Sequence, residues 1–126
     1  ADKVLGDRRD AVEVIAATDF AALYRRFNAL LADTDALWTK PSELGFYAAL
    51  GLPLILDDPV GDHERANARW LLGAGAALRR PAADAARATL SAWLRDGRLA
   101  ACARTGFERL PRGGARAIAE IVFSGT

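Results

Sequence analysis

The order of hydrophobic and polar positions predicts short apolar segments that alternate with helices. Apolar runs over residues 36–39, 54–56 and 76–78 have the length of strands buried in a parallel sheet. A fourth run, over residues 11–17, contains Val12, Val14 and Ile15 and also predicts a buried strand. Because stretches of helical character separate the runs, the pattern favours parallel strands joined by helical crossovers.

The clearest helical pattern follows Thr18 and Asp19, whose side-chain oxygens can cap a helix. Apolar residues then recur in steps of three and four along one face. They are Phe20, Leu23, Tyr24, Phe27, Leu30 and Leu31. This spacing predicts an amphipathic helix between the first two strands.

Two further helices are predicted in the middle of the chain. One runs from a capping Ser42 through Leu50 and is stopped by the Gly51-Leu52-Pro53 sequence. The other begins at a capping Asp62, continues through about residue 72 and ends at the glycines 73 and 75. After Pro81 the pattern is helical to the end of the chain.

These elements predict the α/β class, with a Rossmann-like parallel sheet and flanking helices. The 126 residues suffice for one domain but not for two, so we expect a single domain over residues 1–126. Ligands of such folds bind at the carboxyl ends of the strands. The loops over residues 39–43 and 57–67 are therefore the candidate sites.

The charge balance argues against nucleic acid as a partner. Lysine and arginine number 17 against 16 acidic residues, which gives a net charge of +1. A locally basic stretch lacks the interleaved aromatic residues that bind nucleic acid, so we expect a solvated helix face there. Its arginines are Arg79, Arg80, Arg104, Arg109, Arg112 and Arg116.

The single cysteine and the lengths of the apolar stretches bear on the compartment in which we expect the protein. Cys102 can form neither an intramolecular disulfide nor a cysteine metal site, so we expect a small buried residue and a reducing, cytoplasmic location. No apolar stretch approaches the ~20 residues of a membrane span, and any membrane association is expected to be peripheral. The chain begins at Ala1 and has no methionine, which suggests a fragment.

The first candidate loop collects groups that can bind a phosphate or a ribose. Thr39, Lys40, Ser42 and Glu43 supply two hydroxyls, a cation and a carboxylate at a predicted helix N-terminus, where free backbone N–H groups attract anions. The simpler alternative is that Ser42 only caps the helix and Glu43 only complements its dipole. Glu43 and Tyr47 lie one turn apart, so both can face one ligand or solvent.

The second candidate loop is dense in acceptors and donors. It contains Asp57, Asp58, Asp62, His63, Glu64, Arg65 and Asn67. The lone histidine can transfer protons only if a partner orients it, and otherwise it is a surface residue. The adjacent aspartates lack a third ligand at a characteristic spacing, so we expect no specific metal site. Nucleophile-elbow, dinucleotide and Walker motifs are absent from the sequence.

Two long segments combine several short motifs at fixed spacing. Residues 35–78 read DALWTKPSELGFYAALGLPLILDDPVGDHERANARWLLGAGAAL, in which ALGLP, GDHERAN and GAGAAL follow one another. Residues 90–122 read LSAWLRDGRLAACARTGFERLPRGGARAIAEIV. From Val12 onward the chain resembles the latter part of the C-terminal, donor-binding domain of the GT-B glycosyltransferases.

The resemblance implies binding of a nucleotide-diphosphate sugar and transfer of the sugar to an acceptor, without a metal or another cofactor. His63 and Glu64 match the pair that contacts the donor sugar in relatives, and Asn67 matches a supporting asparagine of the same motif. The family's ribose-binding glutamate corresponds to Phe46 here, and Glu43 lies one helical turn earlier. Thr39-Lys40-Pro41 replaces the glycine-rich start of that loop.

The same comparison implies that further protein is needed. The doubly wound strand order is 3-2-1-4-5-6, and the four predicted strands correspond to the third to the sixth. Either the third and fourth strands pair directly, or a missing segment or a second chain fills the gap between them. The acceptor domain would also lie outside this chain, which alone should be inactive.

Two alternatives to a transferase stay open. The departures at Phe46 and at Thr39-Lys40-Pro41 allow a non-catalytic nucleotide-binding or protein-interaction module on the same scaffold. A sugar-nucleotide epimerase is the other, and its additional acid and base residues would lie outside the chain.

Overall fold

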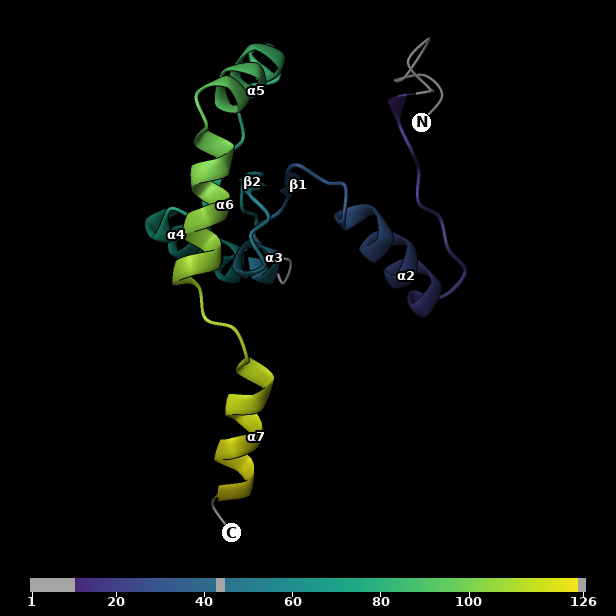
Figure 1. Cartoon of the computed structure of the whole chain (residues 1–126), viewed down its shortest axis with the longest axis vertical. Helices are drawn as coiled ribbons and strands as arrows, with labels where there is room; N and C mark the ends of the chain where they lie inside the picture. Colours follow the sequence, from purple (N-terminus) through teal and green to yellow (C-terminus); the bar gives the residue numbers. More distant parts are fainter. Residues whose placement is uncertain (1–10, 43–44, 125–126) are drawn as a thin grey trace. The chain divides into compact units, whose positions relative to one another are not determined.

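A computed structural model describes residues 11–42 and 45–124 of the chain. Contacts between residues divide the chain into two compact units, Ala1–Thr34 and Asp35–Thr126 (Figure 1). Among the described residues, all three strands and most of the helices belong to the second unit.

The described part of the first unit contains one helix, α2, over Phe20–Leu31. Asp19 is its N-cap and accepts a hydrogen bond of 2.8 Å from the backbone N–H of Ala22. The extended backbone of Asp19 and this side-chain bond are those of an ordinary N-cap. The helix predicted after Thr18 and Asp19 is therefore confirmed, with Asp19 as the capping residue.

The strand predicted over residues 11–17 is wrong. Residues 12–17 are irregular, and Val12 and Val14 expose 43% and 68% of their surface. A strand needs a neighbour for its backbone hydrogen bonds, and no described residue pairs with this segment. The apolar run alone, without such a neighbour, does not produce a strand.

The sheet of the second unit has three parallel strands, β1 (Leu37–Thr39), β2 (Leu54–Leu56) and β3 (Ala77–Arg79). They lie in the order β1-β2-β3, with Leu37 opposite Leu54 and Leu54 opposite Ala77. The predicted strands after residue 35 are confirmed within one residue. Together with the helices they form a small Rossmann-like α/β arrangement, confirmed at that coarse level.

Five helices complete the described part of the second unit. They are α3 (Phe46–Ala49), α4 (Asp62–Ala74), α5 (Ala86–Arg95), α6 (Arg98–Arg109) and α7 (Gly114–Ser124). The helix predicted from Ser42 is shorter than expected: the Ser42 carbonyl accepts from the Gly45 N–H in a turn, and Gly45 is the N-cap. At the end of α4, Gly75 adopts a left-handed conformation with φ of 75°, as a C-terminal glycine does.

The alternation of side chains along the strands builds the core on two faces of the sheet. Ile55 packs in a buried cluster with Trp93 of α5 and Leu99 of α6, and Leu78 lies against the same cluster. Leu54 and Leu56 point to the opposite face and are also buried. The middle strand is thus covered on both sides, as expected of a parallel sheet.

The basic C-terminal stretch is held partly by local contacts. The guanidinium of Arg112 lies 4.0 Å from the centre of the Phe107 ring and donates to the Ala49 carbonyl at 3.4 Å. Arg116 faces Glu120 one turn later in α7, at 3.7 Å. The expected solvated helix face is thus confirmed only for Arg104, Arg109 and Arg116, which are exposed in α6 and α7, because Arg79 lies in β3 and Arg80 and Arg112 lie in loops.

Cys102 is 4% exposed, which confirms the small buried residue. Burial raises the pKa of its thiol, although a backbone hydrogen bond with Leu54 opposes the shift. We therefore expect a thiol reagent to modify Cys102 far more slowly in the native chain than in denaturant at the same pH. Since only the unfolded chain releases this proton at the ordinary thiol pKa, stability should also fall as the pH rises above that value.

Absorbance of the released reagent dye measures this reaction, and Cys102→Ser gives the background. A native reaction as fast as that of the denatured chain would contradict the burial of the thiol. Loss of the pH-dependent part of the stability in Cys102→Ser would assign that part to this residue.

Candidate functional site

The carboxyl ends of the three strands meet along one edge of the sheet. Beyond the paired residues, the N–H of Asp57 donates to the carbonyl of Thr39, and the N–H of Arg80 donates to the carbonyl of Leu56, each at 2.9 Å. The loops that follow the strands therefore lie side by side. This edge is where ligands of open parallel sheets bind.

The first candidate loop leaves the sheet at this edge. Thr39 is half-buried in β1, and Lys40 is exposed directly after it. Ser42 is half-buried, and its backbone N–H donates to the carbonyl of Lys40 at 2.8 Å, which turns the chain toward α3. Glu43 lies outside the described residues. Tyr47, its expected neighbour on the helix, is buried rather than facing solvent.

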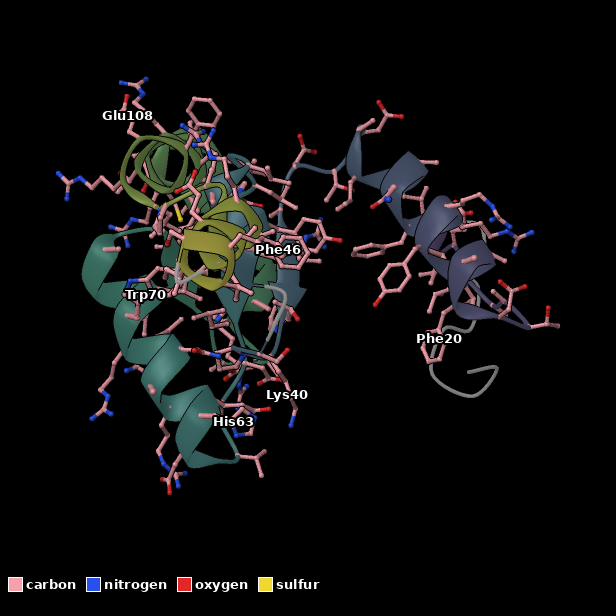
Figure 2. The ribbon with its side chains drawn as sticks, turned by 90° about the horizontal axis from the view of Figure 1, so that it is seen from below. Phe20, Lys40, Phe46, His63, Trp70 and Glu108 are labelled. Atoms are coloured by element: carbon pink, nitrogen blue, oxygen red, sulfur yellow. The ribbon has the colours of Figure 1, made fainter. Side chains whose placement is uncertain are left out.

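Two of the predicted site residues line one hollow of about 240 Å³. Ser42 comes from the first loop and Asn67 from the second turn of α4, and the aromatic side chains of Phe46 and Trp70 line the same space. Leu71 contributes apolar surface there. Figure 2 labels Phe46 and Trp70 in this part of the unit, with Lys40 and His63 nearer the beginning of α4.

The N-terminus of α4 differs from the prediction in its cap. Gly61 occupies the N-cap position and Asp62 is the first helical residue, so the predicted capping role of Asp62 is wrong. Its carboxylate accepts instead from Arg65, at 2.7 Å from Nη2 and 3.1 Å from Nε. The extended Gly61 backbone begins the helix without a side-chain cap.

Glu64 binds the backbone of the loop just before this helix. Its side chain is buried, and its Oε2 accepts from the backbone N–H of Val60 at 2.7 Å. The carboxylate thus reaches back over the first turn, much as the acidic member of a capping box does, and fixes the end of the loop before α4. Among the described residues, the carboxylate of Glu64 thus has a backbone N–H of the protein itself as its hydrogen-bond donor.

His63 is exposed at the second position of α4. Its imidazole folds back over Gly61, so that a Cβ added at Gly61 would lie 3.1 Å from both Cε1 and Nδ1. His63 and Asn67 are one helical turn apart. A ligand that occupies the hollow beside Asn67 can therefore extend toward His63.

Both carboxylates of the acidic pair in the second loop bind the same arginine, Arg80. Nε of Arg80 lies 2.7 Å from Oδ1 of Asp57, and its Nη2 donates to Oδ2 of Asp58 at 2.5 Å. The hydrogen bond to Asp58 and the charge of that carboxylate raise the pKa of Arg80. Within residues 11–42 and 45–124, no group of three or more His, Cys, Asp or Glu residues could hold a metal ion.

Sequence reasoning did not identify the aromatic lining of the hollow. Trp70 exposes half of its surface, and Phe46 exposes 54%. The spacing of Asn67 and Trp70, three residues apart on a helix, could have placed the indole on the same face as the amide. The sequence drew attention to Phe46 only because it stands where the GT-B glycosyltransferases have a ribose-binding glutamate.

No protein family model, no curated protein and no solved structure matches the chain. Among the helices of the described residues, none combines the length and the apolar character needed to cross a bilayer. The site is therefore interpreted from its own residues.

Proposed function

We propose that the chain is the donor-binding portion of a GT-B type glycosyltransferase and binds a nucleotide-diphosphate sugar at the carboxyl edge of its sheet. The observation that carries the proposal is the hollow that Ser42 and Asn67 line together. Sequence reasoning placed these two residues at a ligand, and they come from different elements. A single ligand could contact both residues only if they bordered the same space, as they do in this hollow.

The surroundings of the hollow suit the parts of such a donor. Phe46 and Trp70 offer aromatic surfaces on which a nucleobase can stack. Ser42 and Asn67 can exchange hydrogen bonds with hydroxyl groups, and we propose Glu43, next in sequence to Ser42, for the ribose.

The transfer step needs stabilisation of the departing diphosphate. The free N–H groups at the start of α4 and the exposed ammonium of Lys40 are the groups we propose for this charge, with Thr39 beside them. His63 would contact the sugar, and Glu64 would keep the loop in place through Val60. The acceptor would be held by a further domain or a second chain.

A non-catalytic nucleotide-binding or protein-interaction module is the second candidate. The exposed ring of Phe46, at the position where the GT-B glycosyltransferases carry the ribose-binding glutamate, favours this reading because a phenyl group accepts no hydrogen bond from a ribose hydroxyl. Both candidates predict binding at the same hollow. Only a longer protein that includes the acceptor domain would separate them, by forming or failing to form a glycoside.

The test is titration of the chain with uridine, guanosine and thymidine diphosphate sugars, followed by melting temperature and tryptophan fluorescence. We expect one nucleotide to stabilise the chain and to change the emission of Trp70, which lines the hollow. Asn67→Ala should weaken this binding roughly tenfold, the effect of losing one or two hydrogen bonds to a ligand. His63→Ala should weaken it with little effect on folding, because the imidazole is exposed.

Asn28→Ala is the matched control, since Asn28 is an exposed asparagine in α2 of the other unit. It should bind like the unchanged chain. The proposed donor site would be wrong if no nucleotide sugar altered either signal. Equal weakening by Asn28→Ala and Asn67→Ala would also contradict it.

A further inference from the structure

A second hollow, of about 450 Å³, lies beside the first half of α4 and the end of β3. Three of the six residues that line it are arginines. The lining consists of Pro59, Asp62, Arg65, Ala68, Arg69 and Arg79. Its volume is that of a site for a small molecule.

Helix and strand periodicity bring the three arginines together. Arg65 and Arg69 are four residues apart in α4 and lie one above the other on the same face. In β3, Leu78 packs against the cluster around Ile55, so Arg79 projects from the opposite face of the strand, where α4 lies. Arg79 thus approaches the same hollow from the sheet.

The charges of these arginines are only partly compensated. Arg65 is held by Asp62 and donates to the carbonyl of Val60 at 3.2 Å. Arg69 and Arg79 are exposed, and neither forms an ion pair or a hydrogen bond through its side chain within the described residues. The lining therefore contains three guanidinium groups and one carboxylate.

The nearby acids do not supply the missing charge. Asp57 and Asp58 both bind Arg80, the residue that follows Arg79. The pair keeps one net negative charge, since a single guanidinium faces two carboxylates, but neither carboxylate is ion-paired with Arg69 or Arg79 within the described residues. The groups that line the hollow, three guanidinium groups and one carboxylate, have an excess of positive charge.

This arrangement is unfavourable for the helix itself. Arg65 and Arg69 carry like charges four residues apart in α4, and such charges repel. An anion in the hollow would offset this repulsion. Guanidinium groups also match the geometry of phosphate, to which each can donate two parallel hydrogen bonds.

We propose that Arg65, Arg69 and Arg79 bind the phosphomonoester group of a small ligand in this hollow. A doubly charged phosphate would lie between the two unpaired guanidinium groups, with Arg65 held by Asp62 at its side. The proposal does not rest on a donor site at the other hollow, whose ligand would carry a diphosphate esterified at both ends instead of a phosphomonoester.

The first test is calorimetric titration of the full chain with inorganic phosphate and with glucose 6-phosphate at constant ionic strength. We expect saturable binding of at least one of them. The double variant R69Q/R79Q should weaken it roughly a hundredfold, about tenfold for each charged hydrogen-bonding group that is lost. R95Q/R104Q removes two exposed arginines from α5 and α6 and should bind like the unchanged chain.

A second arm distinguishes a free phosphate compound from a lipid headgroup that carries the same phosphate. Vesicles that contain phosphatidic acid and vesicles of phosphatidylcholine alone are sedimented with the chain. Binding to phosphatidic acid that is lost in R69Q/R79Q identifies a lipid source, whereas binding of soluble glucose 6-phosphate alone identifies a free one. Either result supports the site.

The proposal is overturned if neither the soluble phosphates nor the vesicles bind. It is also overturned if the two double variants weaken binding equally, because net charge rather than the hollow would then be responsible. R69Q/R79Q should leave the response to nucleotide-diphosphate sugars unchanged, so failure of either site can be recognised separately.

Discussion

Replacing Gly106 by alanine is expected to destabilise the chain by about 2 to 3 kcal/mol, the usual cost of forcing a methyl group into a packed interior. Gly106 lies within α6, where α6 packs against α3. A Cβ at this position would overlap the carbonyl oxygen of Ala48 and lie 3.1 Å from its carbonyl carbon. Both atoms belong to the backbone and cannot rotate away, so the two helices would have to separate.

Gly73→Ala is the matched control for this substitution. Gly73 also lies inside a helix, α4, but a Cβ there would meet no atom within 4 Å. Alanine should therefore stabilise the chain by about 0.5 to 1 kcal/mol, through its better helix propensity. Urea unfolding followed by circular dichroism measures both. The close contact between α3 and α6 would be refuted if both variants gained stability.

Leu71→Ala is expected to cost about 3 kcal/mol, in the range observed for buried leucines cut back to alanine. Leu71 is fully buried in α4, and its Cδ1 lies 3.2 Å from the place a Cβ would take at Gly45. The leucine therefore fills the space left by the glycine at the start of α3. Removing it would leave a cavity next to the hollow of Ser42 and Asn67.

The neighbouring residue provides the comparison for Leu71. Leu72 is only half-buried in the same helix, so Leu72→Ala should cost clearly less in urea unfolding. Leu71→Ala should also weaken nucleotide-sugar binding in molecules that remain folded, because the apolar wall of the hollow is lost. Equal losses of stability in the two variants would show that Leu71 does not anchor α3 to α4.

The strands and helices after residue 35 were predictable because their signals are local. The run Leu54-Ile55-Leu56 is too short for a helix, is bounded by a proline and two aspartates, and has the apolar character of a buried parallel strand. Gly51 and Gly75, both with positive φ, end their segments where the sequence indicates. Asp19 caps its helix for the same reason, since its side chain needs only a neighbouring N–H.

The errors concern features that depend on distant partners. The run from Ala11 to Ala17 has the composition of a strand, but a strand exists only when another backbone pairs with it. The helix predicted from Ser42 begins only at Phe46, and its N-cap Gly45 packs against Leu71, which lies 26 residues later in the printed sequence. Neither relation can be inferred from the residues of the segment itself.

The candidate site was predictable to a similar extent. The rule that ligands bind at the carboxyl ends of parallel strands singled out the loops that contain Ser42 and Asn67, and both residues line one hollow. That this hollow binds a ligand stays a prediction. The same rule could not assign different roles to Glu64 and His63. Only the fold shows that the Glu64 carboxylate is buried and binds the backbone of Val60. The arginine-lined hollow depended on the packing of β3 beside α4 and had no signature in sequence order.

The pairing of the strands bears on how the chain acquires its structure. Trp38 pairs with Ile55 and Ile55 with Leu78, so each strand finds its neighbour after one intervening helix. Because each partner lies only one helix away, closing each loop costs less entropy than pairing with a more distant strand would. During synthesis from the N-terminus, β1, β2 and β3 can therefore assemble in turn as each emerges. The contact of Gly106 with Ala48 joins distant segments and can form only after α6 has been made.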